Sequence, residues 1–161
     1  MSAKNRGCVL IDRFSIKEKF LLRTGWYGFL LVGTYAIYLK DPLWAWIYAA
    51  FGILGFALLV LPGMCAHCPY PYEYATCLFF PPALLRRFYA YRGPTMSTAG
   101  KIAALSTLAG LVILPNYWLI HDIRLAVLFW LLAMPSLVVF PLHYCARCRH
   151  HGCPLNKAKR A

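Results

Sequence analysis

The chain has 161 residues, of which 61% are hydrophobic and 14% are charged, and its formal net charge is +12. A soluble domain of this length could not bury so much apolar surface, because ordinary globular chains are about half apolar and about a quarter charged. The composition therefore excludes an ordinary soluble fold and predicts an integral membrane protein.

Four blocks of sequence contain no Asp, Glu, Lys or Arg, namely 24–39, 43–61, 102–120 and 125–142. They are 16 to 19 residues long, whereas a helix that crosses a bilayer needs roughly 20 residues. The first block gains length from the apolar residues 20–22 if Arg23 extends its charged end to the interface. The sequence thus predicts an all-α fold with four transmembrane helices.

The first half of the chain opens with a basic segment that ends in a helix-start signal. Ser15 and Glu18 have the spacing of a capping box, so the first helix is expected to begin at Ile16. Residues 40–42 read as a tight turn on the far side of the membrane. The second helix is expected to end at 62–63, where proline and glycine follow the apolar block.

The longest segment outside the four blocks is the central loop at about 63–100. It is rich in Tyr, Pro and Arg, and its residues 86–92 are expected to form a short interfacial helix. Ser97 or Thr98 can cap the third helix. That helix is expected to run to a second tight turn at 121–122, from which the fourth helix returns.

The basic residues are distributed very unevenly between the two sides of the predicted bundle. Fifteen of the 17 Lys and Arg residues lie before the first helix, in the central loop or after the fourth helix, and only Lys40 and Arg124 lie on the other side. By the positive-inside rule, both termini and the central loop are cytoplasmic, and a prokaryotic inner membrane is expected. Attraction to anionic lipid headgroups explains the net charge without a nucleic-acid partner.

A C-x-x-C motif recurs after the second and the fourth apolar block. An offset of 80 residues superimposes Cys65 on Cys145 and Cys68 on Cys148, and it places the first two blocks on the last two. Each unit crosses the membrane twice, so both units face the same way and a pseudo-twofold axis along the membrane normal is the natural arrangement. Such an axis can bring both cysteine pairs together at the cytoplasmic mouth of the bundle.

The chain is accordingly expected to form one membrane domain, 1–161, built from two tandem helical hairpins. The first repeat takes about 16–80 and the second takes about 101–154, with the central loop between their helices and a basic tail at 155–161. The similarity between the two repeats outside the C-x-x-C motifs lies in their hydropathy.

All seven cysteines lie outside the apolar blocks and on the basic side. A reducing cytoplasm disfavours a structural disulfide framework, which leaves metal binding or redox chemistry. Cysteines separated by two residues can turn both sulfurs towards one ion, and two such pairs supply the four thiolates of a tetrahedral zinc site or an iron–sulfur cluster. The candidate metal ligands are Cys65, Cys68, Cys77, Cys145, Cys148 and Cys153.

Each cysteine pair has a third cysteine downstream, and two arrangements stay open. The two pairs can form one shared centre that Cys77 and Cys153 support, which we favour. Alternatively, each triplet can bind its own ion with a fourth ligand. The candidates for that fourth ligand are Cys8, His67, His143, His150 and His151.

The identity of the metal is suggested by the residues that follow the cysteines. Cys-Pro occurs at 68–69 and 153–154, and this dipeptide is similar to the cysteine runs of bacterial-type ferredoxins, although their complete C-x2-C-x2-C-x3-C-P run is absent. Zinc knuckles usually carry glycine after the second cysteine, and here those positions are Pro69 and Arg149. The sequence favours an iron–sulfur cluster over zinc, and zinc over metal-free thiol chemistry.

The leading functional hypothesis is a small membrane protein that presents a cysteine-ligated metal centre to the cytoplasm, as an electron-transfer or anchoring subunit for a soluble partner. No carboxylate pair, nucleophile–base set or phosphate loop is evident in the sequence, so enzyme activity is unsupported. One alternative is a membrane thiol/disulfide oxidoreductase, which would resemble the quinone-coupled disulfide-forming enzymes in helix count and motif. Those enzymes keep their reactive cysteines on the oxidising side.

A second alternative is a heavy-metal transporter similar to the mercury-uptake proteins, which relay the ion through a cysteine pair within a span. The predicted spans of this chain contain no cysteine and no interior histidine, so a haem held between two helices also has no ligands here. Aromatic residues such as Tyr35 and Trp130 are expected to pack or to face lipid rather than form a quinone site. The glycines expected to permit close helix approach are Gly25, Gly28, Gly33, Gly52 and Gly55.

Overall fold

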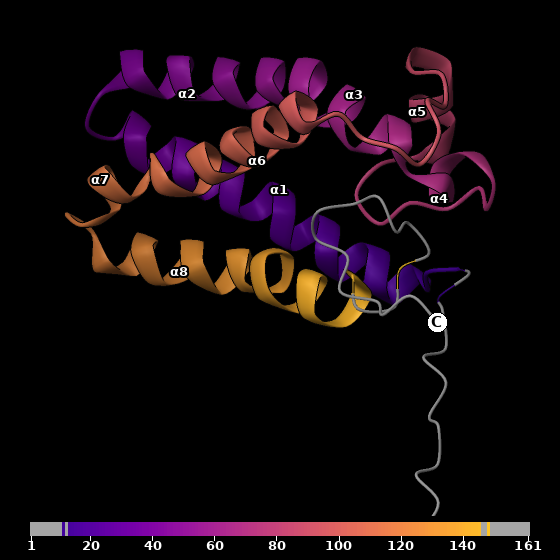
Figure 1. Ribbon diagram of the computed structural model, residues 1–161. Helices are drawn as coiled ribbons and strands as arrows, with labels where there is room; N and C mark the ends of the chain where they lie inside the picture. Colours follow the sequence, from indigo (N-terminus) through magenta and orange to yellow (C-terminus); the bar gives the residue numbers. More distant parts are fainter. Residues whose placement is uncertain (1–10, 12, 146–147, 149–161) are drawn as a thin grey trace, which may run out of the picture.

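A computed structural model of the protein describes residues 11, 13–145 and 148, and this part of the chain forms helices and loops without any strand (Figure 1). The all-α expectation is therefore confirmed for these residues. The long helices are α1 (Ile16–Tyr38), α2 (Pro42–Gly55), α6 (Thr98–Ile113) and α8 (Ile123–Met134). The shorter elements are the π-helices η1 (Phe56–Val60) and η3 (Pro135–Tyr144), the 3-10 helix η2 (Cys65–His67), and α3 (Leu61–Gly63), α4 (Pro69–Tyr72), α5 (Pro82–Phe88) and α7 (Asn116–Leu119).

Three helical stretches are long and apolar enough to cross a membrane, and they are Pro42–His67, Thr98–Leu119 and Ile123–Tyr144. They contain the second and fourth apolar blocks and all but the last residue of the third. All but the last residue of the first block lies in α1, which has 23 residues but is not among the three stretches. The mean hydropathy of α1 is lowered by Arg23 and by several glycines and tyrosines. The structure thus supports three of the four predicted spans by length and composition.

The predicted helix starts of α1 and α6 are confirmed. The Ser15 hydroxyl accepts a hydrogen bond from the Glu18 N–H at 3.2 Å, and the Ser15 N–H donates to Glu18 Oε2 at 2.6 Å, so the capping box is complete. This backbone hydrogen bond is the main reason that the pKa of Glu18 lies below its ordinary value. Ser97 caps α6 in the same way, with its hydroxyl accepting from the Gly100 N–H at 3.1 Å.

Proline positions explain two places where the helices differ from the prediction. The third helix breaks after Ile113, because Pro115 has no N–H to donate to the preceding turn, and α7 then follows. The central loop forms its helix at Pro82–Phe88 rather than at 86–92, because proline favours the first helical position and the backbone becomes extended at Tyr89. The α-helical part of the second stretch ends at Gly63, as predicted, and the 3-10 helix η2 with Cys65 then follows within the candidate span Pro42–His67.

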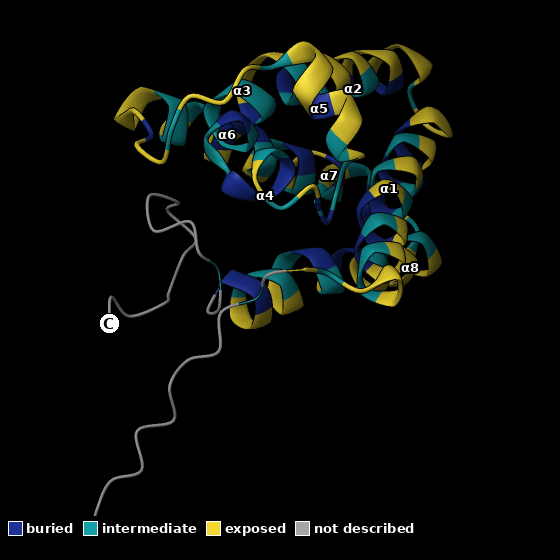
Figure 2. Ribbon diagram, turned by 90° about the vertical axis from the view of Figure 1, so that its right-hand side faces the viewer, coloured by how far each residue is buried: buried dark blue, intermediate teal, exposed yellow. Residues whose placement is uncertain are grey.

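Helix α1 lies between the other long helices and packs against α2 on one side and α8 on the other. The remaining long helix, α6, packs against α2 and η1. Figure 2 shows α2 and α6 together on one side of the molecule and α8 on the other, with α1 joining them. The core between these helices contains fully buried side chains from four elements, namely Phe29, Ile37, Leu111, Leu119 and Phe129.

Small residues permit this close packing, as expected from the sequence. A Cβ atom at Gly25 would lie 2.8 Å from the backbone oxygen of Leu132 on α8, and one at Gly55 would lie 2.8 Å from Thr107 Cγ2 on α6. Four of the five predicted glycines lie closer to a neighbouring helix than ordinary contact would allow for a Cβ atom. The exception is Gly52, where the nearest atom would be at an ordinary 3.4 Å.

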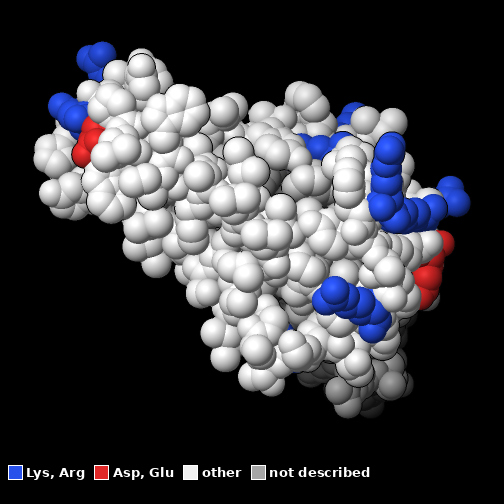
Figure 3. Space-filling view, turned by 90° about the horizontal axis from the view of Figure 1, so that it is seen from above, with Lys and Arg blue, Asp and Glu red and all other residues white. Residues whose placement is uncertain are grey.

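Charged side chains on the face shown in Figure 3 lie at the two ends of the molecule, with an uncharged band between them. The exposed surface of the long helices includes many large apolar residues, for example Trp46 on α2 and Ile113 on α6, which are 72% and 67% exposed. A soluble monomer rarely exposes so much apolar surface. The surface therefore agrees with a protein whose middle lies in a membrane.

Candidate cysteine site

The two C-x-x-C motifs share one backbone hydrogen bond. The N–H of Cys68 donates to the carbonyl of Cys65 at 3.2 Å, and the N–H of Cys148 donates to the carbonyl of Cys145 at 3.5 Å. Each motif follows a helical stretch that contains a π-helical segment, η1 in the first half and η3 in the second. The first cysteine of each motif therefore lies at or just after the end of a candidate membrane span.

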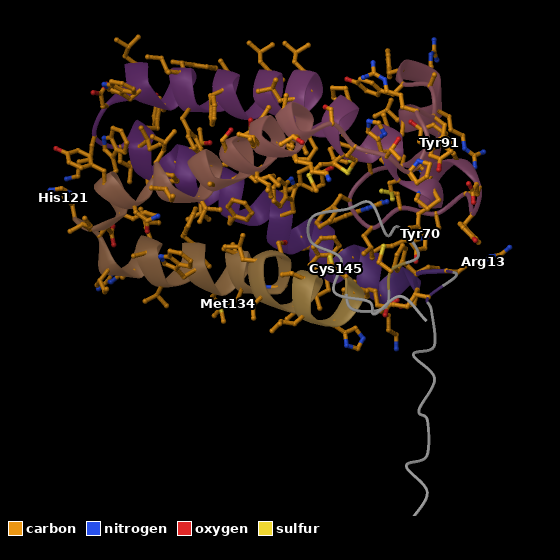
Figure 4. The ribbon with its side chains drawn as sticks, viewed as in Figure 1. Arg13, Tyr70, Tyr91, His121, Met134 and Cys145 are labelled. Carbon is orange, nitrogen blue, oxygen red and sulfur yellow. The ribbon has the colours of Figure 1, made fainter. Side chains whose placement is uncertain are left out.

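Cysteines from both halves of the chain line one cavity. The cavity has a volume of about 510 Å³, and its walls include α6 and η3. Its cysteines are Cys65, Cys68, Cys77, Cys145 and Cys148. Figure 4 shows Cys145 towards the same end of the molecule as Tyr70, while His121 lies at the opposite end. Five of the six predicted ligands thus line the same cavity, and the sixth, Cys153, lies outside the described residues.

Electrostatics around Cys68 reflect this clustering. Burial is the main cause that raises the pKa of the Cys68 thiol well above its ordinary value, and a hydrogen bond from the Tyr70 backbone partly opposes it. Negative charge on Cys65, Cys148 or Cys77 would raise the Cys68 pKa further. Thiolates from the two halves therefore oppose one another's ionisation, and a bound cation would remove that opposition.

Cys77 has positive charges beside it. Burial raises the pKa of its thiol, whereas the N–H groups of Phe80 and Phe79 and then the charges of Arg23 and Lys19 act to lower it. Both basic residues belong to α1, so the first helix supplies cations to a site whose sulfurs come from other segments. These cations offset part of the effect of burial, which still leaves the Cys77 pKa above its ordinary value.

Arg23 makes two contacts that the sequence did not predict. Its Nε donates to the carbonyl of Leu78 at 3.0 Å, and its Nη2 donates to the carbonyl of Cys77 at 3.3 Å. The side chain is partly exposed. It ties the loop that carries Cys77 to α1.

Two further side chains fix the loop that follows the first motif. Arg86 on α5 donates from Nε to the carbonyl of Pro71 at 2.6 Å and from Nη2 to the carbonyl of Tyr72 at 3.0 Å. The Nδ1 atom of His67 lies 2.8 Å from the carbonyl oxygen of Gly93. His67 thus uses this nitrogen to hold the loop backbone, so Nδ1 is not available as the fourth ligand considered above.

The cavity itself was not predicted from the sequence, because no local pattern shows that α6 and η3 stand apart. Among residues 11, 13–145 and 148, no three His, Cys, Asp or Glu side chains are grouped closely enough to hold a metal ion. The candidate ligands Cys8, His150 and His151 lie outside this part of the chain. Comparison of the sequence and the structure with protein-family models, curated proteins and solved structures gives no match.

Proposed function

We propose that this chain is a membrane protein that holds one cysteine-ligated centre, shared by its two halves, and that it serves as an electron-transfer or anchoring subunit for a soluble partner. The observation that carries the proposal is the shared cavity, since Cys65, Cys68 and Cys77 line it together with Cys145 and Cys148. Two separate centres would instead need the two cysteine groups to face different spaces. In this proposal Cys153 supports the second pair.

An iron–sulfur cluster fits the described residues better than a single zinc ion. Around tetrahedral zinc, Zn–S bonds of about 2.3 Å hold the sulfurs about 3.8 Å apart, and the described cysteines form no such tight group of three. The cysteines of a [4Fe–4S] cluster stand farther apart, because each binds a different iron. The cations Arg23 and Lys19 beside Cys77 also suit a centre with net negative charge.

The two tandem hairpins remain part of this proposal and have local support. Each half contains a serine-capped helix, an aspartate-capped helix, a π-helical segment and a C-x-x-C turn, in that order. The capping residues Asp41 and Asp122 have nearly the same backbone angles, with φ of −147° and −141°. We infer that α1 is the fourth span and that a pseudo-twofold axis along the membrane normal relates the halves.

The thiol/disulfide oxidoreductase alternative is less well supported. A reactive cysteine needs a lowered pKa, because the thiolate is the nucleophile. Burial raises the pKa of both Cys68 and Cys77. The heavy-metal transporter alternative needs a cysteine pair within a span, whereas in the described part of the chain only Cys65 lies within a candidate span, in its last turn.

Protein purified without oxygen is expected to contain iron and acid-labile sulfide in near-stoichiometric amounts and to show the broad visible absorption of an iron–sulfur cluster. Elemental analysis, sulfide assay and an absorption spectrum of the same sample check this. Stoichiometric zinc in a colourless protein would support the shared centre but reject the cluster. A folded protein with neither metal would overturn the proposed function.

The termini and the central loop are proposed to be cytoplasmic, in a prokaryotic inner membrane. A membrane-impermeant thiol reagent applied to intact cells is expected to label a Lys40→Cys variant, because Lys40 is exposed in the turn between α1 and α2. A Thr95→Cys variant, exposed in the central loop, is expected to react only after the cells are opened. The unmodified protein is the background control, and labelling of Thr95→Cys from outside would reverse the proposed topology.

A further inference from the structure

The cavity at the cysteine site has the size and lining of a small-molecule site. Its volume of about 510 Å³ falls within the roughly 300–1,000 Å³ of ligand pockets. Apart from the cysteines, its lining consists almost entirely of apolar and aromatic side chains. A cavity of this size is normally closed by packing in a protein core. We therefore expect an apolar molecule to fill this cavity.

Aromatic rings form a continuous wall beside the cysteines. The ring of Phe79 contacts those of Trp26 and Phe140, with its centre 5.6 Å from the first and 4.9 Å from the second. Phe14 and Tyr70 form a further pair at 4.9 Å. All five side chains line the cavity. Flat rings of this kind favour a flat, conjugated ligand, because aromatic faces stack best on planar partners.

The cavity reaches the outer surface of α6. Leu105, Ala109 and Ile113 line it and are also exposed, and they lie on one side of the candidate span Thr98–Leu119. In the proposed membrane arrangement this surface faces the hydrocarbon of the bilayer. A ligand dissolved in the membrane could therefore enter between α6 and η3 without crossing water.

We propose that this cavity binds an isoprenoid quinone, with the ring against the aromatic wall and the tail leaving past Ala109 into the lipid. The inference rests on the proposed function, in which the cysteine centre carries electrons. A cluster held by these cysteines would supply electrons one at a time, so two successive electrons, each restored by a reduced soluble carrier protein, and two protons from water on the cysteine side would convert the quinone to the quinol. A phospholipid acyl chain could fill the same volume, but it gains nothing from a wall of flat rings next to a redox centre.

The test compares two variants that add the same bulk at exposed alanines on different helices. Ala109→Trp places an indole in the mouth of the cavity, whereas Ala50→Trp places one on α2 away from the cavity lining. Each protein is reconstituted in lipid nanodiscs, and its affinity for a quinone with a ten-carbon tail is measured by quenching of Trp26 fluorescence. A Trp26→Phe variant identifies the part of the signal that comes from the cavity.

The affinity for the quinone is expected to fall at least tenfold in Ala109→Trp and to stay within twofold of the unmodified protein in Ala50→Trp. A benzene ring with the same ten-carbon tail is expected to compete at least tenfold more weakly than the quinone. Equal affinity in Ala109→Trp, or equal competition by the alkylbenzene, would overturn the quinone site, the second result indicating a lipid-chain cavity.

The same samples separate this inference from the proposed function. Metal content is measured in each variant, and Ala109→Trp is expected to keep the metal content of the unmodified protein while losing quinone. Quinone binding in a protein without metal would reject the electron-transfer function but leave the quinone site standing. Metal at full occupancy without quinone binding would reject the quinone site but leave the electron-transfer function standing.

Discussion

Changing Cys65 to Ser is expected to remove nearly all of the bound metal, and changing Cys145 to Ser is expected to do the same. The two cysteines belong to different halves of the chain but line one cavity. A shared centre that loses either ligand keeps only three thiolates from the two C-x-x-C pairs, so its affinity for metal should fall by at least about tenfold. Metal and sulfide content of the purified variants, relative to protein, measures the effect.

The control for these variants is Met64→Leu. Met64 lines the same cavity directly before Cys65, and leucine replaces methionine with little change in volume, so the metal content should be unchanged. Circular dichroism would show whether each variant keeps its helices. If Cys65→Ser retains about half of its metal, each cysteine triplet binds its own ion, and the shared centre is rejected although the helical fold stands.

Changing Gly25 to Ala is expected to destabilise the protein by about 1–3 kcal/mol, the usual range for extra volume in a packed core. The new Cβ atom would lie 2.8 Å from the backbone oxygen of Leu132 and 3.5 Å from the Ser136 hydroxyl oxygen. A backbone oxygen cannot rotate away as a side chain can, so α1 and α8 must move apart. Reversible unfolding in mixed micelles measures the change in the free energy of unfolding.

Gly52→Ala is the matched control, since it adds the same methyl group to another membrane helix. Its Cβ atom would meet Leu111 Cδ2 at an ordinary 3.4 Å, and alanine in place of glycine favours a helix by about 0.5–1 kcal/mol. The stability of Gly52→Ala is therefore expected to be unchanged or slightly higher. Equal stability of the two variants would mean that α1 does not approach α8 as closely as the structure indicates.

The cavity that cysteines of both halves line arises because the helices of the two halves pack differently, although the two halves have the same order of elements. In the first half, α1 packs directly against α2. In the second half, α6 packs mainly against α2 and η1, while α8 packs against α1. The side chains of α6 and η3 therefore face each other across the cavity instead of packing together. If α6 packed against α8 as α1 packs against α2, side chains would fill this space.

Much of the helical framework could be predicted from the sequence because its signals are local. The capping box of Ser15 and Glu18 acts over three residues, and it marks the start of α1 correctly. Long runs without charge identify membrane helices, since a charge in the hydrocarbon is costly wherever the helix packs. The two C-x-x-C motifs likewise pointed, by their spacing alone, to four of the five cysteines that line the cavity.

The tertiary structure decided what depends on contacts between distant residues. The sequence gives no sign that the carbonyls of Cys77 and Leu78, more than 50 positions away, hold the side chain of Arg23. The meeting of Cys65 with Cys145 at one cavity likewise depends on how two hairpins pack, which hydropathy does not encode because every face of these helices is apolar. The sequence by itself determined most of the helices and the positions of the cysteines relative to them, because both follow from local patterns, and the packing of α6 and η3 around an open space decided that cysteines from both halves line one cavity.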